Sequence, residues 1–118
     1  MRTPFVSVIV PVLNSEKTIE RCITSLLDQD YPMDKYEIIF VDNGSTDHTL
    51  KILNNFNKNI KILKEPIESS YRARNKGIMN TKGDIIAFTD SDCVADYNEM
   101  EINNRDDIDA IIKYEKVI

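Results

Sequence analysis

Continuous apolar stretches alternate along the chain with stretches in which apolar residues recur every three or four positions. The continuous stretches predict four β-strands, at residues 5–13, 36–42, 59–66 and 84–90. The first, second and fourth stretches are almost wholly apolar, which is typical of strands that are covered on both faces. Lysines interrupt the third, which we therefore expect near an edge of the sheet.

Three helices are predicted between these strands. The apolar face of the first consists of Ile19, Cys22, Ile23, Leu26 and Leu27. Asn14 or Ser15 is placed to cap its N-terminus. The second helix follows the turn sequence NGSTD, and its inner face is Leu50, Leu53 and Phe56. The third lies within residues 69–83, beginning at a capping serine and stopping at Gly83.

The alternation of strands and helices predicts an α/β fold, with a mostly parallel sheet and helices on both faces. Ligands of such sheets bind beyond the carboxyl ends of the strands, where the strand order reverses. Three segments directly follow strands: 11–16, 42–47 and 90–93. We therefore expect Asp42, Asp90 and Asp92 to share one edge. Because acidic residues are common in turns, a solvated turn or a helix cap is the alternative for Asp42.

Composition narrows the classes of partner. The chain has 118 residues, enough for one domain, and its net charge of −5 disfavours nucleic acid and anionic membranes as nonspecific partners. No window is apolar enough for a transmembrane span, and no signal peptide is visible. We therefore expect a cytoplasmic protein, a location that includes the periphery of a membrane. Cys22 and Cys93 have neither zinc-site spacing nor a secreted context, so free thiols are expected.

The sequence TDSDC places two carboxylates, Asp90 and Asp92, after a buried strand. Neither a G-x-G-x-x-G nor a G-x-x-x-x-G-K-[ST] phosphate-binding motif is present. A diphosphate at an acidic edge then needs a divalent cation, and carboxylate oxygens favour Mg²⁺ or Mn²⁺.

Two alternatives for this pair are a calcium loop and a phosphotransferase. A calcium loop requires glycine at the position of Ala95 and an acid or amide at that of Val94. A phosphotransferase with an aspartate nucleophile carries a similar local sequence, but usually on its first strand and with further catalytic residues downstream.

Three segments carry a resemblance to a known family. They are SVIVPVLNSEKTIERCITSLLDQDYPMDKYEIIFVDNGSTDHT, ARNKG and GDIIAFTDSDC. In this order they resemble the nucleotide-sugar-binding half of a family 2 glycosyltransferase with the Rossmann-like GT-A fold, over residues 4 to about 96. The resemblance implies a region 1–96 that binds a nucleotide diphosphate-sugar, with a UDP-sugar favoured and Mn²⁺ or Mg²⁺ as cofactor, for inverting sugar transfer.

The resemblance also implies roles for single residues. Pro11 and Asn14 would lie beside the nucleotide, Glu16 near the base or ribose, and Asp42 in a hydrogen bond with the base. For Glu16, a favourable charge at a helix N-terminus is the alternative. Leu13 stands where many members have a tyrosine that stacks on the base.

For the diphosphate end, the resemblance implies Arg74 near the phosphates and Asp90 and Asp92 as the Asp-x-Asp pair that engages ribose and metal. A surface ion pair is the alternative for Arg74. Asn43 replaces an aspartate that is frequent in the family, which we interpret as a mild change.

Residues 97–118 predict a loop and one helix, at 104–116, outside the clear resemblance. Inverting transfer needs a base that removes a proton from the acceptor, and Glu99, Glu101 and Asp106 are weak candidates for it. Whether this chain transfers a sugar is therefore left open. The alternative is a non-catalytic nucleotide-binding or self-assembling module, with a homo-oligomer as its expected form.

Overall fold

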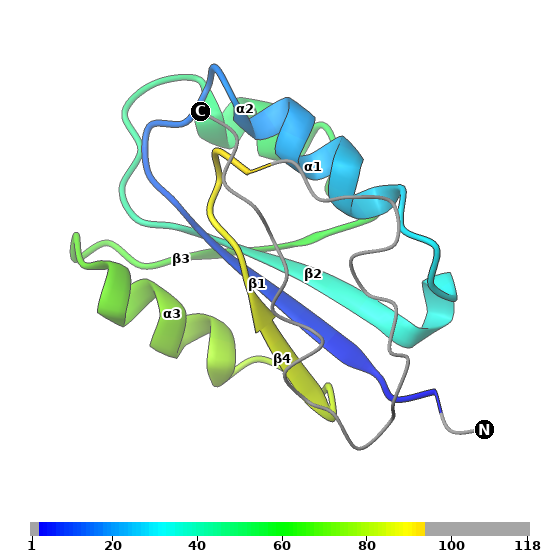
Figure 1. The fold of residues 1–118 in the computed structure, drawn as a ribbon. Helices are drawn as coiled ribbons and strands as arrows, with labels where there is room; N and C mark the ends of the chain where they lie inside the picture. Colours follow the sequence, from blue (N-terminus) through cyan, green and yellow to red (C-terminus); the bar gives the residue numbers. More distant parts are fainter. Residues whose placement is uncertain (1–2, 94–118) are drawn as a thin grey trace.

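Four parallel strands form one sheet in the order β3-β2-β1-β4 in the computed structural model, which describes residues 3–93 (Figure 1). The strands are β1 (Val6–Val12), β2 (Tyr36–Asp42), β3 (Lys61–Lys64) and β4 (Ile85–Phe88). The helices are α1 (Ile19–Leu27), α2 (Thr49–Asn54) and α3 (Ser70–Ile78), with a 3₁₀ turn η1 (Met33–Lys35). The predicted parallel α/β fold is confirmed, and β3 lies at an edge of the described sheet as its lysines indicated.

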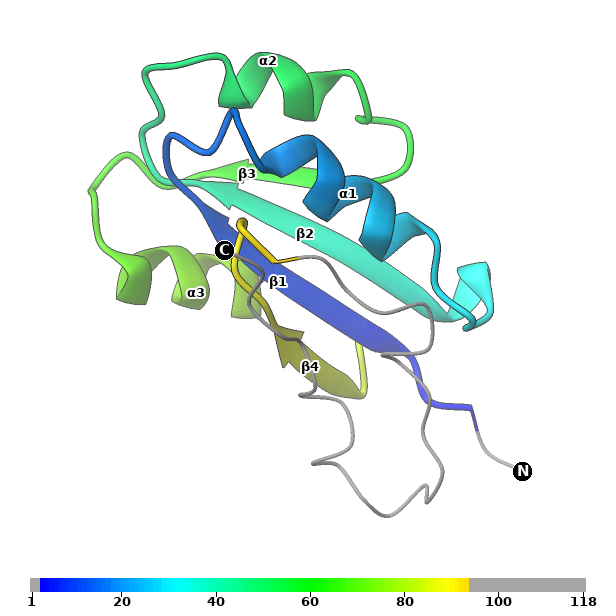
Figure 2. The ribbon, with the colours of Figure 1, turned by 45° about the horizontal axis from the view of Figure 1, so that its top comes forward.

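The helices cover both faces of the sheet, with α1 and α2 on one face and α3 on the other (Figure 2). Alternate residues of β1 therefore enter different cores. Val6, Val8, Val10 and Val12 pack with α1 and with Leu53 of α2, whereas Ile9 packs with Ala73 of α3. Side chains of a strand alternate between faces, so two buried faces explain why the sequence of β1 is apolar throughout.

The start of α1 differs from the prediction. The residue at the N-cap is Thr18, and neither Asn14 nor Ser15 occupies that position. The contribution of Ser15 comes from its backbone, because its carbonyl oxygen accepts hydrogen bonds from the N–H groups of Thr18 and Ile19 at 3.0 and 2.9 Å. The chain thus makes one further turn before the helix begins.

The predicted role of Gly83 is also wrong. Helix α3 begins, as expected, at a capping serine: the Ser69 hydroxyl accepts from the N–H of Arg72 at 3.3 Å. It ends at Ile78, five positions before Gly83. A Cβ at Gly83 would lie 2.4 Å from Ser7 Oγ and 2.7 Å from the backbone nitrogen of Ser7. Glycine is needed there because the loop entering β4 passes directly over β1.

Both cysteines in the described part of the chain, Cys22 and Cys93, are buried free thiols, as predicted. Across residues 3–93, the helices are too short and too polar for any of them to cross a lipid bilayer. The domain boundary near residue 96, the helix at 104–116 and the candidate bases all lie outside the described residues.

Candidate functional site

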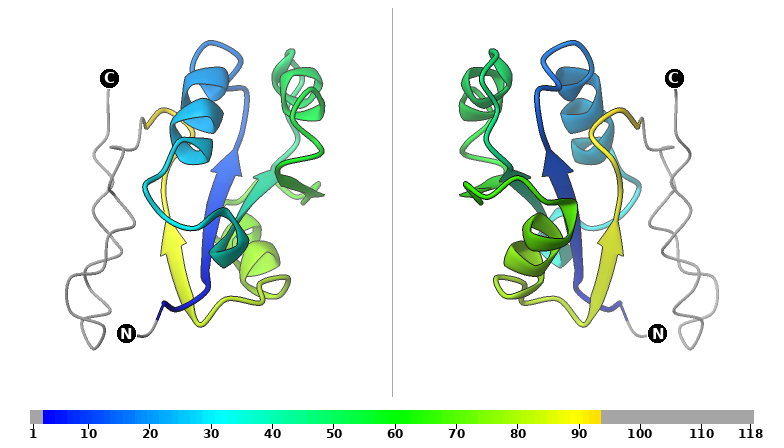
Figure 3. Two further views of the ribbon diagram at one scale, coloured as in Figure 1. Left: turned by 90° about the vertical axis from the view of Figure 1, so that its right-hand side faces the viewer. Right: turned by 90° about the vertical axis from the view of Figure 1, so that its left-hand side faces the viewer.

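The loops that follow β1, β2 and β4 meet at the carboxyl edge of the sheet. The backbone N–H of Asn14 donates to Ser45 Oγ at 2.9 Å, which joins the first two loops. The hydroxyls of Ser15 and Ser91 lie 2.7 Å apart, which joins the first and the last. Viewed from the side, β1 and β4 run together in the same direction, and their loops lie at the same end (Figure 3). The expected shared edge is therefore present.

A pocket of about 430 Å³ opens between the ends of β1 and β4 and the start of α3. It is lined by Pro11, Val12, Leu13, Asn43, Glu68, Ser69, Ser70, Arg74, Asp90 and Ser91. Successive strands run from β1 outward to β3, and the chain then returns to the other side of β1 as β4. The pocket thus lies where the strand order reverses, the usual ligand position in such sheets.

A second pocket, of about 460 Å³, lies on the other side of Ser91. It is lined by Asn14, Ser15, Glu16, Lys17, Thr18, Asp47, Ser91 and Asp92. The predicted site residues are therefore divided. Pro11, Arg74 and Asp90 line the first pocket, and Asn14, Glu16 and Asp92 line the second. Ser91 lines both, so the spacer of the Asp-x-Asp sequence separates the two pockets.

Asp42 lines neither pocket. Its side chain is buried, with 4% exposed, so the solvated-turn alternative is wrong. Asp42 Oδ2 accepts from the N–H groups of Gly44 and Ser45 at 3.4 and 3.2 Å, which closes the turn after β2. Asp42 Oδ1 has no donor among residues 3–93. A buried acceptor without a donor costs free energy, and the predicted contact with a base stays a prediction.

Asn14 and Glu16 hold the first two loops together. Asn14 has a left-handed backbone, with φ at 47°, and its Oδ1 accepts from the N–H of Thr46 at 2.8 Å. Glu16 Oε1 accepts from the N–H of His48 at 2.9 Å and lies 3.1 Å from His48 Nδ1. Each side chain therefore has a structural role, whatever ligand it also contacts.

Asp47 is a wall residue of the second pocket that the sequence analysis did not single out. Desolvation raises the pKa of its carboxyl group, but hydrogen bonds from Thr49 and from the N–H of Glu16 outweigh that effect and lower it below its ordinary value. Asp47 is therefore a fixed negative charge at neutral pH. A carboxylate three residues past the glycine of a Gly-Ser turn is a common feature of loops. The sequence therefore gave no clear indication that Asp47 lines a pocket.

Arg74 projects from α3 and is exposed on the wall of the first pocket. Within residues 3–93 it has no carboxylate partner, so the ion-pair alternative finds no support in this part of the chain. A guanidinium group has several donors in a planar fork, which suits the oxygens of a phosphate. The arrangement leaves this positive charge for a ligand of the pocket.

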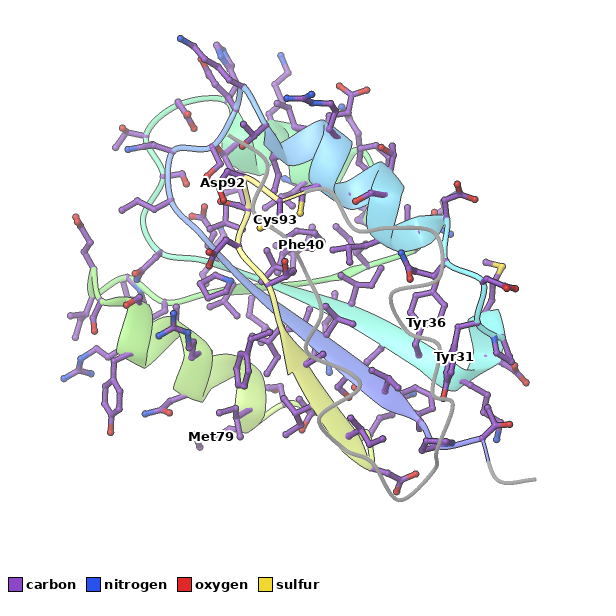
Figure 4. The ribbon with its side chains drawn as sticks, in the orientation of Figure 1. Tyr31, Tyr36, Phe40, Met79, Asp92 and Cys93 are labelled. Atoms are coloured by element: carbon purple, nitrogen blue, oxygen red, sulfur yellow. The ribbon has the colours of Figure 1, made fainter. Side chains whose placement is uncertain are left out.

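Asp90, Asp92 and Cys93 form a cluster in which one ligand atom of each lies within 4.8 Å of the others. Figure 4 shows Asp92 and Cys93 beside α1. The two carboxylates, exposed and half-buried, offer the hard oxygen ligands that Mg²⁺ and Mn²⁺ prefer. The Cys93 thiol is buried, and its Sγ lies 3.9 Å from Asp92 Oδ1. The carboxylate pair therefore fits the predicted cation.

The Cys22 thiol on α1 contacts the turn that carries Asp90 and Asp92. Its Sγ donates to the carbonyl oxygen of Asp90 at 3.7 Å. Burial, followed by the nearby Cys93, Asp92 and Asp90, raises the pKa of the Cys22 thiol to about 12. Cys22 is therefore a protonated thiol at neutral pH, which is the form that donates.

Asn43 is a residue whose importance the sequence analysis missed. Its Nδ2 donates to the carbonyl oxygens of Glu65 and Ile67 at 2.8 and 2.7 Å, and its Oδ1 accepts from the N–H of Ser69 at 2.8 Å. An aspartate side chain has no N–H to donate. The replacement of the family's aspartate by Asn43, which looked mild, therefore suits the two carbonyl oxygens that accept from Asn43. No local pattern reveals it, because the partners lie 22 to 26 positions away.

A parallel sheet with a pocket at its reversal point defines an α/β ligand-binding domain. The glycosyl transferase family 2 model matches residues 7–102. The chain belongs to glycosyltransferase family 2, and its fold is that of the nucleotide-binding part of GT-A enzymes.

The chain is similar to a glycosyltransferase, AglE, of Haloferax volcanii, with 46% identity over 94 residues. These residues are 76% of this chain and 31% of that protein. It also resembles the solved structure of Staphylococcus aureus TarS 1–349 in complex with UDP, with a TM-score of 0.77 and 33% identity. That match covers 82% of this chain and 30% of the other.

A second structural relative is the mannosyltransferase PcManGT of Pyrobaculum calidifontis, solved in complex with GDP-Man and Mn²⁺. Its TM-score is 0.76 at 30% identity, over 80% of this chain and 29% of the other. The chain thus spans less than a third of the length of each of these relatives.

Proposed function

We propose that this chain binds a nucleotide diphosphate-sugar together with a divalent metal ion, as the donor-binding part of an inverting glycosyltransferase. The observation that carries the proposal is the first pocket. It brings the Arg74 guanidinium and the Asp90 carboxylate to one cavity, with Asp92 two positions further on. The positive guanidinium group of Arg74 suits the negative phosphate oxygens of a diphosphate, and the negative carboxylate of Asp90 suits the metal ion that those oxygens bind.

The likeness to TarS supports a UDP-sugar as the favoured donor. TarS has been solved with UDP and with UDP-GlcNAc, and PcManGT with GDP-Man and Mn²⁺. Leu13 replaces the tyrosine expected to stack on the base, so the described residues of this chain do not themselves select the base. We therefore assign the donor class from the phosphate-binding residues and favour uridine from the likeness to TarS.

Asp90 and Asp92 would hold Mn²⁺ or Mg²⁺, which supplies positive charge against the departing diphosphate. Arg74 binds a phosphate oxygen from the side of α3 and stabilises the same negative charge. Pro11 packs beside the nucleotide, and Asn14 and Glu16 shape the neighbouring loop. The predicted contact of Asp42 with the base requires the buried Oδ1 to become exposed when the nucleotide binds. In this proposal the described part of the chain binds and orients the donor.

A second candidate is a self-associating, non-catalytic nucleotide-binding module. Tyr71 on α3 and Met79 at its C-cap favour it, because these large side chains are 72% and 84% exposed. Burial of such surface against a second copy would remove apolar area from water. Equilibrium ultracentrifugation distinguishes the candidates: a dimer that Tyr71→Ser dissociates, without any sugar transfer, supports the module.

Thermal unfolding with UDP or GDP, each with and without Mn²⁺, tests donor binding. At about 100 times its dissociation constant a ligand stabilises the folded chain by about 2.7 kcal/mol. We expect a shift with UDP that depends on Mn²⁺ and that Asp92→Asn removes. Asp34→Asn is the matched control, since Asp34 lies in η1 at the opposite end of β2. A shift that Asp92→Asn leaves intact contradicts the proposal.

A further inference from the structure

The spacer residue of the Asp-x-Asp sequence is held by the first turn of α1. The Thr18 hydroxyl donates to the carbonyl oxygen of Ser91 at 3.1 Å. The hydroxyls of Ser15 and Ser91 form a second hydrogen bond at 2.7 Å, and the Ser15 hydroxyl also lies 3.2 Å from the Leu13 carbonyl oxygen. Both partners lie more than 70 positions before Ser91 in the sequence.

The contacts of Ser15 and Thr18 hold a turn that lies beyond the hydrogen bonds of the sheet. The last hydrogen bond between β4 and β1 joins the N–H of Thr89 to the carbonyl oxygen of Ile9 at 3.2 Å. Beyond it the chain turns, and the N–H of Cys93 donates to the Asp90 carbonyl oxygen at 3.1 Å. Residues 90 and 92 of an extended strand would lie on one face with their Cα atoms about 6.6 Å apart, and in this turn ligand atoms of Asp90 and Asp92 lie within 4.8 Å of each other. Residues 15 and 18 hold that turn from outside the sheet.

The hydroxyl of Thr18 is used in an unusual way for its position. A threonine at an N-cap ordinarily accepts a hydrogen bond from an N–H in the first helical turn. Thr18 makes no such capping bond. Its hydroxyl acts as a donor, to the carbonyl oxygen of Ser91 at 3.1 Å and, at the longer distance of 3.5 Å, to that of Ser15.

The supporting residues are themselves fixed. The backbone N–H of Ser15 donates to Thr49 Oγ1 at 2.7 Å, and Thr49 is fully buried. Ser15 and Thr18 both line the second pocket, next to Asp92. A rigid support on one side of Ser91 therefore determines where the carboxylates on either side of it can lie.

We propose that Ser15 and Thr18 are positioning residues for metal binding: they hold Ser91 so that the carboxylates of Asp90 and Asp92 serve one ion. The inference rests on the proposed function, because it requires that these carboxylates bind a metal. Neither Ser15 nor Thr18 contacts the metal ion in this proposal. Loss of a hydrogen bond that orients a metal ligand typically lowers metal affinity about 10- to 100-fold.

Titration of the 118-residue chain with Mn²⁺ alone, with free Mn²⁺ read by electron paramagnetic resonance, tests the inference. We expect Thr18→Val and Ser15→Ala each to raise the dissociation constant for Mn²⁺ about 10-fold. Thr18→Ser retains the hydroxyl and restores binding to within about twofold of the wild type. With Mn²⁺ at saturating concentration, UDP binding measured by calorimetry stays within about twofold in every variant.

Thr24→Val is the matched control, because among residues 3–93 the Thr24 hydroxyl bonds only to carbonyl oxygens of its own helix, those of Glu20 and Arg21. Equal losses in Thr18→Val and Thr24→Val, or wild-type Mn²⁺ affinity in both Thr18→Val and Ser15→Ala, overturn the positioning role while donor binding stands. If the wild type binds neither Mn²⁺ nor UDP, the proposed function itself fails. Circular dichroism identifies any variant that does not fold, and the other variant then decides.

Discussion

The side-chain oxygen of Asn43 accepts a hydrogen bond from the backbone N–H of Ser69 at 2.8 Å. The end of β2 is thereby joined to the residue that caps α3 and lines the first pocket. The amide group of Asn43 also donates to two carbonyl oxygens of the same loop. One buried side chain thus shapes the wall of the pocket from which Arg74 projects.

Asn43→Asp is expected to destabilise the fold. The substitution removes two donated hydrogen bonds and places a carboxylate against two carbonyl oxygens in a buried site. We expect a loss of about 1–3 kcal/mol in the free energy of unfolding, measured by urea denaturation. Asn57→Asp, the same substitution at an exposed position, is expected to change it by less than about 0.5 kcal/mol. Similar losses in the two variants would contradict this account.

Arg74→Ala is expected to weaken UDP binding by about 10-fold or more. Hydrogen bonds to charged groups contribute about 1.5–3 kcal/mol each, and Arg74 is the arginine on the wall of the first pocket. Calorimetric titration with UDP and Mn²⁺ measures the change. Arg72→Ala is the matched control, because Arg72 lies on the same helix but lines a different cavity, with Tyr71 and Met79. Equal effects of the two substitutions would refute the role of Arg74.

Stability is expected to fall above about pH 9, in part through Cys22. Burial, with smaller contributions from Cys93, Asp92 and Asp90, raises the pKa of this thiol from 9.0 to about 12. The unfolded chain therefore loses the proton first, and the folded state loses stability as the pH rises from 9 towards 12. The pKa values of Tyr31 and Tyr36 are also raised, chiefly by burial, and act in the same direction.

The Cys22→Ala variant isolates the contribution of the thiol, because both tyrosines remain. Its unfolding free energy should decline less steeply than that of the wild type between pH 9 and 11 when both are followed by urea denaturation. Parallel declines would show that the thiol does not contribute.

Gly83→Ala is expected to destabilise the fold by about 1–3 kcal/mol, the usual cost of overpacking. The added methyl group would meet the backbone nitrogen of Ser7 in β1, which cannot move without disturbing the sheet. Thermal unfolding measures the loss. Lys58→Ala, at an exposed position before β3, is the comparison, and we expect it to be nearly neutral. A neutral Gly83→Ala would show that the close approach to Ser7 does not require glycine.

The sequence by itself determined the element order and the parallel sheet, and it placed the acids after β2 and β4 at one edge. These features depend on local periodicity: β1 is apolar throughout because both of its faces are covered, and α1 carries one apolar stripe. The family also followed from local motifs, which remain recognisable without knowledge of any contact.

Only the tertiary structure decided how the site is held together. Thr18 supports Ser91, Asn43 joins β2 to the start of α3, and Gly83 lies against Ser7. Each contact joins residues between 26 and 76 positions apart. Periodicity describes only neighbours along the chain, whereas these contacts exist because folding brings the loops after separate strands to one edge, where their polar groups must find partners.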